Sequence, residues 1–171
     1  DDNYMLILAE SPVIFEIVKA ELIKPVKGTT EFIYTGEEQT YDISGFNPDT
    51  MDIAGNKMTD AGSQTVAVSI KDETNYRWAD KTEDDVTFTF TIGKRNISDV
   101  TITINPNANL TYTGLVIEPG ITVTLGGDLF DASNYSVSYE NNINAGTATV
   151  KITAKGTHYD GTATKDFVIY K

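Results

Sequence analysis

The stretch Ile121-Thr122-Val123-Thr124-Leu125 alternates apolar and polar side chains at every second residue. This period places the apolar side chains on one face of an extended chain, which is the pattern of a half-buried β-strand. Residues 100–104, 135–139 and 150–154 alternate in the same way. The period therefore predicts an all-β fold for the second half of the chain.

Turn-forming residues separate these predicted strands. Glycine, asparagine and aspartate tolerate the positive φ angles that tight turns require. They cluster in four segments: 105–107, 126–128, 140–142 and 160–162. One strand and one turn together take roughly ten residues, which is the spacing typical of a β-sandwich.

The first half is patterned alike, although less regularly. Residues 66–70 and 86–90 alternate at period two, whereas residues 44–57 do not. We expect a loop or a short edge strand in that irregular segment. No window of ten or more residues holds a clean helical period, so we expect helices to be absent or very short.

Short sequence markers recur along the chain in the same order. Tyr34-Thr35-Gly36 returns as Tyr112-Thr113-Gly114, and residues 60–66 are answered by residues 144–150. Recurrence of this kind indicates repeated structural units. It predicts two modules, residues 20–93 and residues 94–171.

The amino-terminal segment resembles the closing piece of such a module. Asn3-Tyr4 precedes an alternating strand pattern at residues 15–19, as Asn75-Tyr76 precedes the one at residues 88–92. We expect residues 1–19 to be the tail strands of a preceding repeat, packed on the first module; alternatively, the module boundaries are permuted. The linker at residues 91–97 runs strand into strand, which predicts a stiff rod cut from a longer protein.

Composition limits the classes of partner. The chain has 13 basic and 25 acidic residues, a net charge of -12, so nucleic acid would be repelled. The longest apolar stretch, residues 5–9, is far short of the roughly 20 residues that cross a bilayer, so we expect no membrane insertion. Cysteine is absent, which excludes disulfides and thiolate metal sites.

Residues for catalysis are scarce. His158 is the only histidine, and it stands in a turn next to Tyr159, so we interpret it as a turn residue. Nucleophilic triads and histidine zinc sites therefore lack their components, and we expect no enzyme activity and no cofactor. Calcium is the one ion that the acidic turns would suit, with Asp72-Glu73 or residues 83–85 as ligands.

Tyr76 and Trp78 are the candidate ligand-binding residues. Trp78 is the only tryptophan, and it adjoins a charged stretch that the second half lacks. Exposed rings at these positions would stack on a sugar face. Packing in the core or between modules is the alternative, and the one that we favour.

One set of markers resembles a known family. It comprises Tyr112-Thr113-Gly114, Pro119, Asn134-Tyr135, residues 144–147, residues 159–162 and Phe167. These residues are similar to the YDG/MBG-type and related immunoglobulin-like repeats of bacterial surface proteins. In the first half, Arg77-Trp78 replaces the Asp160-Gly161 pair.

The resemblance implies two tandem immunoglobulin-like β-sandwich modules, extracellular at the cell surface or secreted. It implies a non-catalytic stalk, spacer or adhesion unit whose partners are neighbouring repeats of the same chain. A module that binds host or environmental glycan or glycoprotein is the alternative function. A β-grasp is the alternative fold, and it would need a helix across its sheet.

Overall fold

The computed structural model describes residues 16–171 and confirms an all-β, sandwich-type fold. The one helical element in the described residues is a 3-10 turn, Ala132–Asn134. Asp131 caps this turn, since its side chain accepts a hydrogen bond of 2.8 Å from the Ser133 N–H. The β-grasp alternative is therefore wrong for this part of the chain, because no helix crosses a sheet.

The first half of the described chain, residues 20–93, contains ten strands. They are β1 (Ala20–Leu22), β2 (Val26–Lys27), β3 (Phe32–Ile33), β4 (Gln39–Thr40), β5 (Ile43–Ser44), β6 (Met51–Ala54), β7 (Lys57–Met58), β8 (Gly62–Ile70), β9 (Tyr76–Trp78) and β10 (Val86–Gly93). The irregular segment at residues 44–57 holds the short strand β6 at the edge of its sheet, as predicted.

A four-stranded sheet in the order β3-β10-β8-β6 forms one layer of the first half. The antiparallel pairs β2-β5 and β4-β7 contribute the facing side chains. The core between them falls into two clusters. One surrounds Trp78 and the other surrounds Phe90, and both residues have no exposed surface.

The second half, residues 94–171, contains eight strands. They are β11 (Arg95–Asn96), β12 (Thr101–Ile104), β13 (Ile121–Leu125), β14 (Asp128–Leu129), β15 (Tyr135–Glu140), β16 (Gly146–Ala154), β17 (Tyr159–Asp160) and β18 (Thr162–Ile169). The four strands predicted from alternation are present as β12, β13, β15 and β16.

Two three-stranded sheets, β12-β13-β14 and β15-β16-β18, face each other in the second half. Their inward side chains form one continuous core. This core includes Val123 from one sheet and Val150 and Ile152 from the other, all almost fully buried. The alternation read from the sequence is thus the alternation between core and solvent.

Backbone hydrogen bonds in the two halves follow a common pattern. The N–H of Tyr34 donates to the Gly93 carbonyl over 2.9 Å, and the N–H of Tyr112 donates to the Tyr170 carbonyl over 2.7 Å. The edge strands pair similarly, because β1 runs parallel to β9 and β11 runs parallel to β17. The long strands β8 and β16 are each flanked by two antiparallel neighbours.

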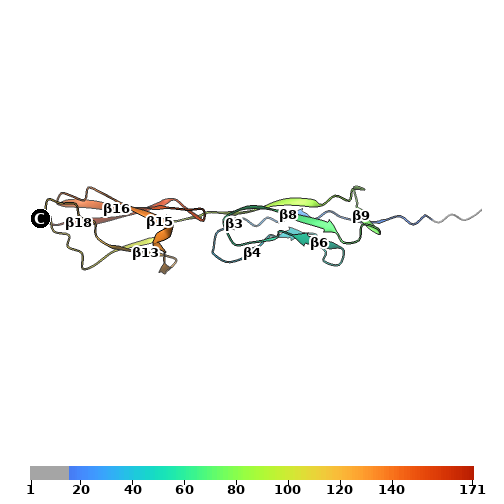
Figure 1. The fold of residues 1–171 in the computed structure, drawn as a ribbon, viewed down its shortest axis with the longest axis horizontal. Coiled ribbons are helices and arrows are strands. Elements are labelled where there is room, and N and C mark those ends of the chain that lie inside the picture. The colour runs from blue at the N-terminus through green and yellow to red at the C-terminus, as the bar shows by residue number, and fades with distance from the viewer. Residues whose placement is uncertain (1–15) are drawn as a thin grey trace, which may run out of the picture.

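The two halves lie end to end along the long axis of the molecule (Figure 1). Strand β10 ends at Gly93 and β11 begins at Arg95, so Lys94 alone separates them. The predicted passage of strand directly into strand is confirmed.

Residues 16–19 are the described part of the predicted tail of a preceding repeat. They carry no strand, and the side chains of Ile17 and Val18 are 96% and 63% exposed. Ile17 and Val18 therefore do not pack on the first half, whereas Lys19 forms an ion pair with Glu83 of that half. The remainder of that prediction, residues 1–15, lies outside the described residues.

Within residues 16–171 we find no helix with the length and apolar character needed to cross a membrane.

Candidate functional site

Trp78 is a core residue. Its side chain has no exposed surface, and it packs with Met51, Val68 and Ile70. Its indole N–H donates a hydrogen bond of 2.9 Å to the Asp84 carbonyl, which satisfies the one polar atom of the ring. Trp78 therefore cannot stack on a sugar, and its assignment as a ligand-binding residue is wrong. The alternative reading, packing in the core, is the correct one.

Tyr76 lies two residues before Trp78 on β9 and is half-buried. Side chains two residues apart on a strand share a face, and Tyr76 accordingly packs against the same core cluster. The two rings do not form an exposed aromatic platform. The glycan-binding alternative thus loses the pair of residues on which it depended.

The acidic turns proposed as calcium ligands engage groups of the protein. Asp72 accepts hydrogen bonds from the backbone and side chain of Asn75, and these bonds lower the pKa of its carboxyl. Glu83 pairs with Lys19, and Asp84 accepts from Trp78 through its backbone carbonyl. Among the described residues, no group of three or more acidic, histidine or cysteine side chains is placed to hold a metal ion.

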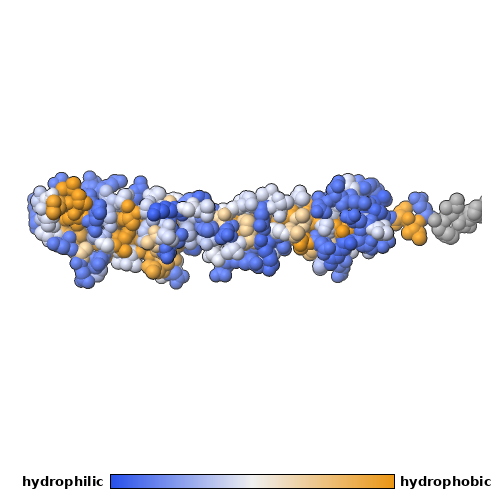
Figure 2. Space-filling model, in the orientation of Figure 1, coloured by the Kyte–Doolittle hydropathy of each residue, from blue (hydrophilic) through white to orange (hydrophobic). Residues whose placement is uncertain are grey.

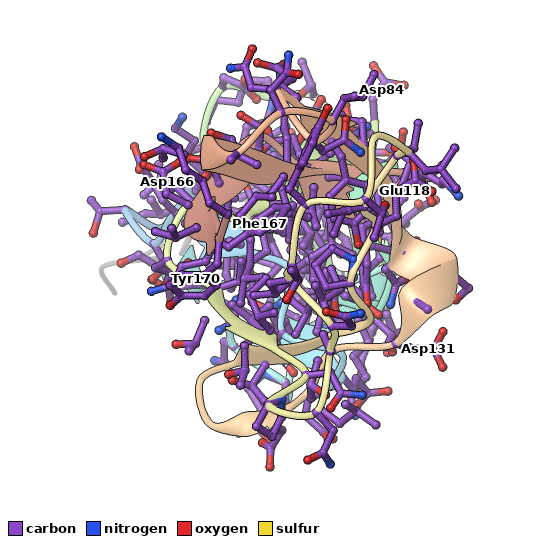
Figure 3. The ribbon with its side chains drawn as sticks, turned by 90° about the vertical axis from the view of Figure 1, so that its left-hand side faces the viewer. Asp84, Glu118, Asp131, Asp166, Phe167 and Tyr170 are labelled. Carbon is purple, nitrogen blue, oxygen red and sulfur yellow. The ribbon has the colours of Figure 1, made fainter. Side chains whose placement is uncertain are left out.

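Carboxylates on the molecule are spread rather than gathered in the end-on view of Figure 3. Asp84, Glu118, Asp131 and Asp166 lie apart around the edge of that view. Asp166 accepts a hydrogen bond of 2.7 Å from Thr149, and Asp131 caps the 3-10 turn. Asp131 and Asp166 thus stabilise a local turn and a local strand pair.

The junction between the halves brings distant residues together and is the candidate functional site. The ring of Tyr34 stacks on His158, with centroids 4.4 Å apart and an interplanar angle of 21°. Tyr159 meets the Tyr34 ring edge-on at 5.4 Å. Stacked and edge-to-face geometries are the favoured arrangements of aromatic pairs, so these contacts hold the two halves against each other.

Polar contacts surround this aromatic stack. The Nε2 atom of His158 lies 3.2 Å from Oδ1 of Asp60, and Lys94 donates a hydrogen bond of 3.2 Å to the Gly156 carbonyl. Burial raises the pKa of the Tyr34 hydroxyl, and the neighbouring Tyr159 and Asp60 raise it further. Tyr34 is therefore a neutral hydroxyl in a partly desolvated interface.

A surface groove of about 650 Å³ runs beside the junction. Ile33, Tyr34 and Thr35 line it from one half, and Arg95, Asn96 and Asp99 line it from the other. The two walls of this groove belong to different halves, so bending of the molecule at the junction would change its width.

The Tyr-Thr-Gly turn sets the direction of the Tyr34 ring. Gly36 has a φ of 86°, which suits glycine and no other residue well. The Thr35 hydroxyl accepts a hydrogen bond of 3.2 Å from the Glu37 N–H. Local sequence therefore fixes the turn, and the turn places the ring at the end of the first half.

His158 lies in a turn, as predicted. Its contact with Tyr34 across the two halves was not predicted. The sequence feature that could have indicated this contact is the recurrence of short markers. Tyr34 belongs to one repeated marker, and Tyr159 belongs to another.

No family model, no curated protein and no solved structure matches this chain.

Proposed function

We propose that this chain is a non-catalytic spacer, built from repeat modules of a bacterial surface or secreted protein. It would hold other parts of that protein at a fixed distance. The observation that carries the proposal is the junction, where Tyr34 stacks on His158 and meets Tyr159 edge-on. The two halves joined there are arranged end to end (Figure 1).

The chain connection supports a stiff spacer. A single residue, Lys94, lies between β10 and β11. A connection this short leaves little freedom for the halves to turn, and the aromatic stack and the His158–Asp60 contact restrict what freedom remains. A flexible tether would instead be long and rich in glycine or serine.

Matched pairings support the assignment as repeats. Strand β6 meets β8 with Met51 opposite Ile70, and strand β15 meets β16 with Tyr135 opposite Ala154. The same offset of 84 relates both partners of the first pair to those of the second. A constant offset over a whole strand pair is expected of two copies of one unit.

An extracellular setting agrees with the sequence. A strongly acidic surface keeps a long array soluble and separated from polyanionic surfaces. The markers that resemble YDG/MBG-type repeats also point to surface or secreted proteins, in which the partners are neighbouring repeats of the same chain.

Small-angle X-ray scattering on the intact chain tests the spacer proposal. We expect the maximum dimension to match the end-to-end arrangement and to stay constant as salt increases. The variant Tyr34→Ser should broaden the distance distribution, since it removes the stack on His158. The proposal would be contradicted if the distance distribution of the unaltered chain could be fitted only by an ensemble with many different angles between the two halves.

A further inference from the structure

The end of the second half carries the same turn that forms the junction at the end of the first half. Gly114 has a φ of 76°, and the Thr113 hydroxyl accepts a hydrogen bond of 3.3 Å from the Leu115 N–H. The turn at Gly36 has the same two features. A β-carbon at either glycine would lie 3.8–3.9 Å from the hydroxyl of the preceding tyrosine, so the tyrosine rings take the same direction.

Surrounding residues also correspond between the two ends. Tyr112 donates its N–H to the carbonyl of Tyr170, next to Lys171, as Tyr34 donates to Gly93, next to Lys94. Asn144 stands two residues before Gly146, the first residue of β16, as Asp60 stands two residues before Gly62, the first residue of β8. The C-terminal tip thus repeats the Tyr-Thr-Gly turn of the junction, with Asn144 in place of Asp60 and with Leu115 and Val116 in place of Glu37 and Glu38.

Exposure distinguishes the two surfaces. Tyr34 is half-buried because it packs on His158 and Tyr159, whereas Tyr112 is 48% exposed. Leu115, Val116 and Ile143 lie exposed beside it at 72%, 57% and 46%. Figure 2 shows hydrophobic surface at this end of the molecule. The apolar tip, defined by Tyr112, Leu115, Val116 and Ile143, has no partner among the described residues.

We propose that the apolar tip docks the His-Tyr end of another module built like residues 94–171. In this interface Tyr112 stacks on the histidine and meets the tyrosine edge-on, as Tyr34 does with His158 and Tyr159. This inference rests on the proposed spacer function, and it extends that function by naming the surface through which an array grows.

An end-to-end interface of this kind connects unlike surfaces, and it joins the units along their long axis, so it does not form a closed twofold dimer. Contacts that join the tail of one unit to the head of the next produce open, linear arrays rather than closed dimers. The interface between the apolar tip and the next module is small, so it forms to a large extent only when the two modules are covalently joined. A covalent connection raises the effective concentration of the two surfaces. The docked partner in this proposal is a module tethered as closely as the two halves are here, where Lys94 alone separates β10 from β11.

The test extends the full chain by a second copy of residues 95–171 placed directly after Lys171. With isotope labels in one unit at a time, residual dipolar couplings report the alignment of each unit. We expect the added unit to share one alignment tensor with the unit before it. Tyr112→Ser should abolish this sharing, whereas Leu129→Ser, an exposed residue away from the tip, should leave it unchanged.

The variant Asn144→Asp sharpens the test. It restores the carboxylate that Asp60 presents to His158, so it should reduce the angular spread between the docked units. An added unit that aligns independently, that fails to fold, or that aligns equally well after Tyr112→Ser would overturn the docking proposal. If residues 20–93 and 94–171 also align independently, the spacer function itself fails; if they stay aligned together, it stands without the docking.

Discussion

The two halves of the molecule place different residues at one position of a common framework. Trp78 ends β9 in the first half, and seven residues follow before β10 begins. In the second half, Gly161 with a φ of 86° is the only residue between β17 and β18. The parallel pairs β1-β9 and β11-β17 are nonetheless alike.

This difference shows that the parallel pairing of these short strands does not depend on the residues that follow them. A seven-residue loop follows β9, which ends at Trp78, in one half, and Gly161 in a tight turn follows β17 in the other. The difference also affects the hydrophobic cores. The first half has two smaller clusters, one of them centred on Trp78, whereas the second half has one continuous cluster. The two halves should therefore respond differently to mutation.

Trp78→Ala should have the largest effect. Removing a fully buried tryptophan costs about 3–5 kcal/mol, because both transfer energy and packing are lost. Amide hydrogen exchange should show the loss in residues 20–93 and leave residues 97–169 protected. Leu129→Ala, at a 76% exposed position, is the control and should change stability by less than about 0.5 kcal/mol.

Gly55→Ala should follow in size. Gly55 has a φ of 71°, and a β-carbon there would lie 2.3 Å from the Thr65 carbonyl oxygen. We expect a loss of about 2–3 kcal/mol from strain and displaced backbone, measured by chemical denaturation. Gly127→Ala, with a φ of 100° and open space around it, should lose only about 1 kcal/mol. Equal losses would mean that the contact with Thr65 has no effect.

Tyr34→Ser should have a smaller effect on stability and a clear effect on the junction. The stack on His158 and the edge contact with Tyr159 are each worth about 0.5–1.5 kcal/mol. Differential scanning calorimetry should show the two halves unfolding more independently. Tyr112→Ser is the matched control, since its ring is exposed at the opposite end, and it should leave the transition unchanged.

Acid should weaken the first half slightly. The side-chain hydrogen bond from Lys24, followed by bonds from Thr82, lowers the pKa of Asp80 to about 2. Because the folded pKa lies below the unfolded value of about 3.9, the stabilisation is present above about pH 4 and is lost as the pH falls toward 2. In Asp80→Asn, the unfolding temperature of residues 20–93 should fall less between pH 4 and pH 2 than it does in the unaltered chain. The unfolding temperature of the second half should not change.

The strands were predictable because their side chains alternate between a core and solvent. Ile121–Leu125 matches β13 to the residue, and residues 66–70 lie within β8. In both cases the sequence period and the burial pattern describe the same physical face.

The position of Trp78 was harder to predict. Tyr76 and Trp78 share one face of β9, which already favoured a common environment in the core. The charged residues that follow suggested exposure instead. They form the loop that covers the indole, and the Asp84 carbonyl from that loop accepts its hydrogen bond. A loop that folds back over a ring leaves no period in the sequence.

The junction depends on contacts between residues far apart in the chain, so no local pattern reports it. The recurrence of Tyr34 as Tyr112 indicates a shared role, but the role becomes visible only where His158 and Tyr159 meet the first ring. The sequence thus predicted the alternating strands and the direct passage from β10 to β11, and it did not predict the residues that meet at the junction.

We propose that the two halves form one rigid body through this junction. Backbone ¹⁵N relaxation of the intact chain tests it most directly, because an elongated rigid body gives both halves one anisotropic diffusion tensor. We predict that residues 20–93 and 94–171 fit the same tensor, with its long axis along the molecule. Two separate tensors, each typical of a single half tumbling alone, would contradict the claim.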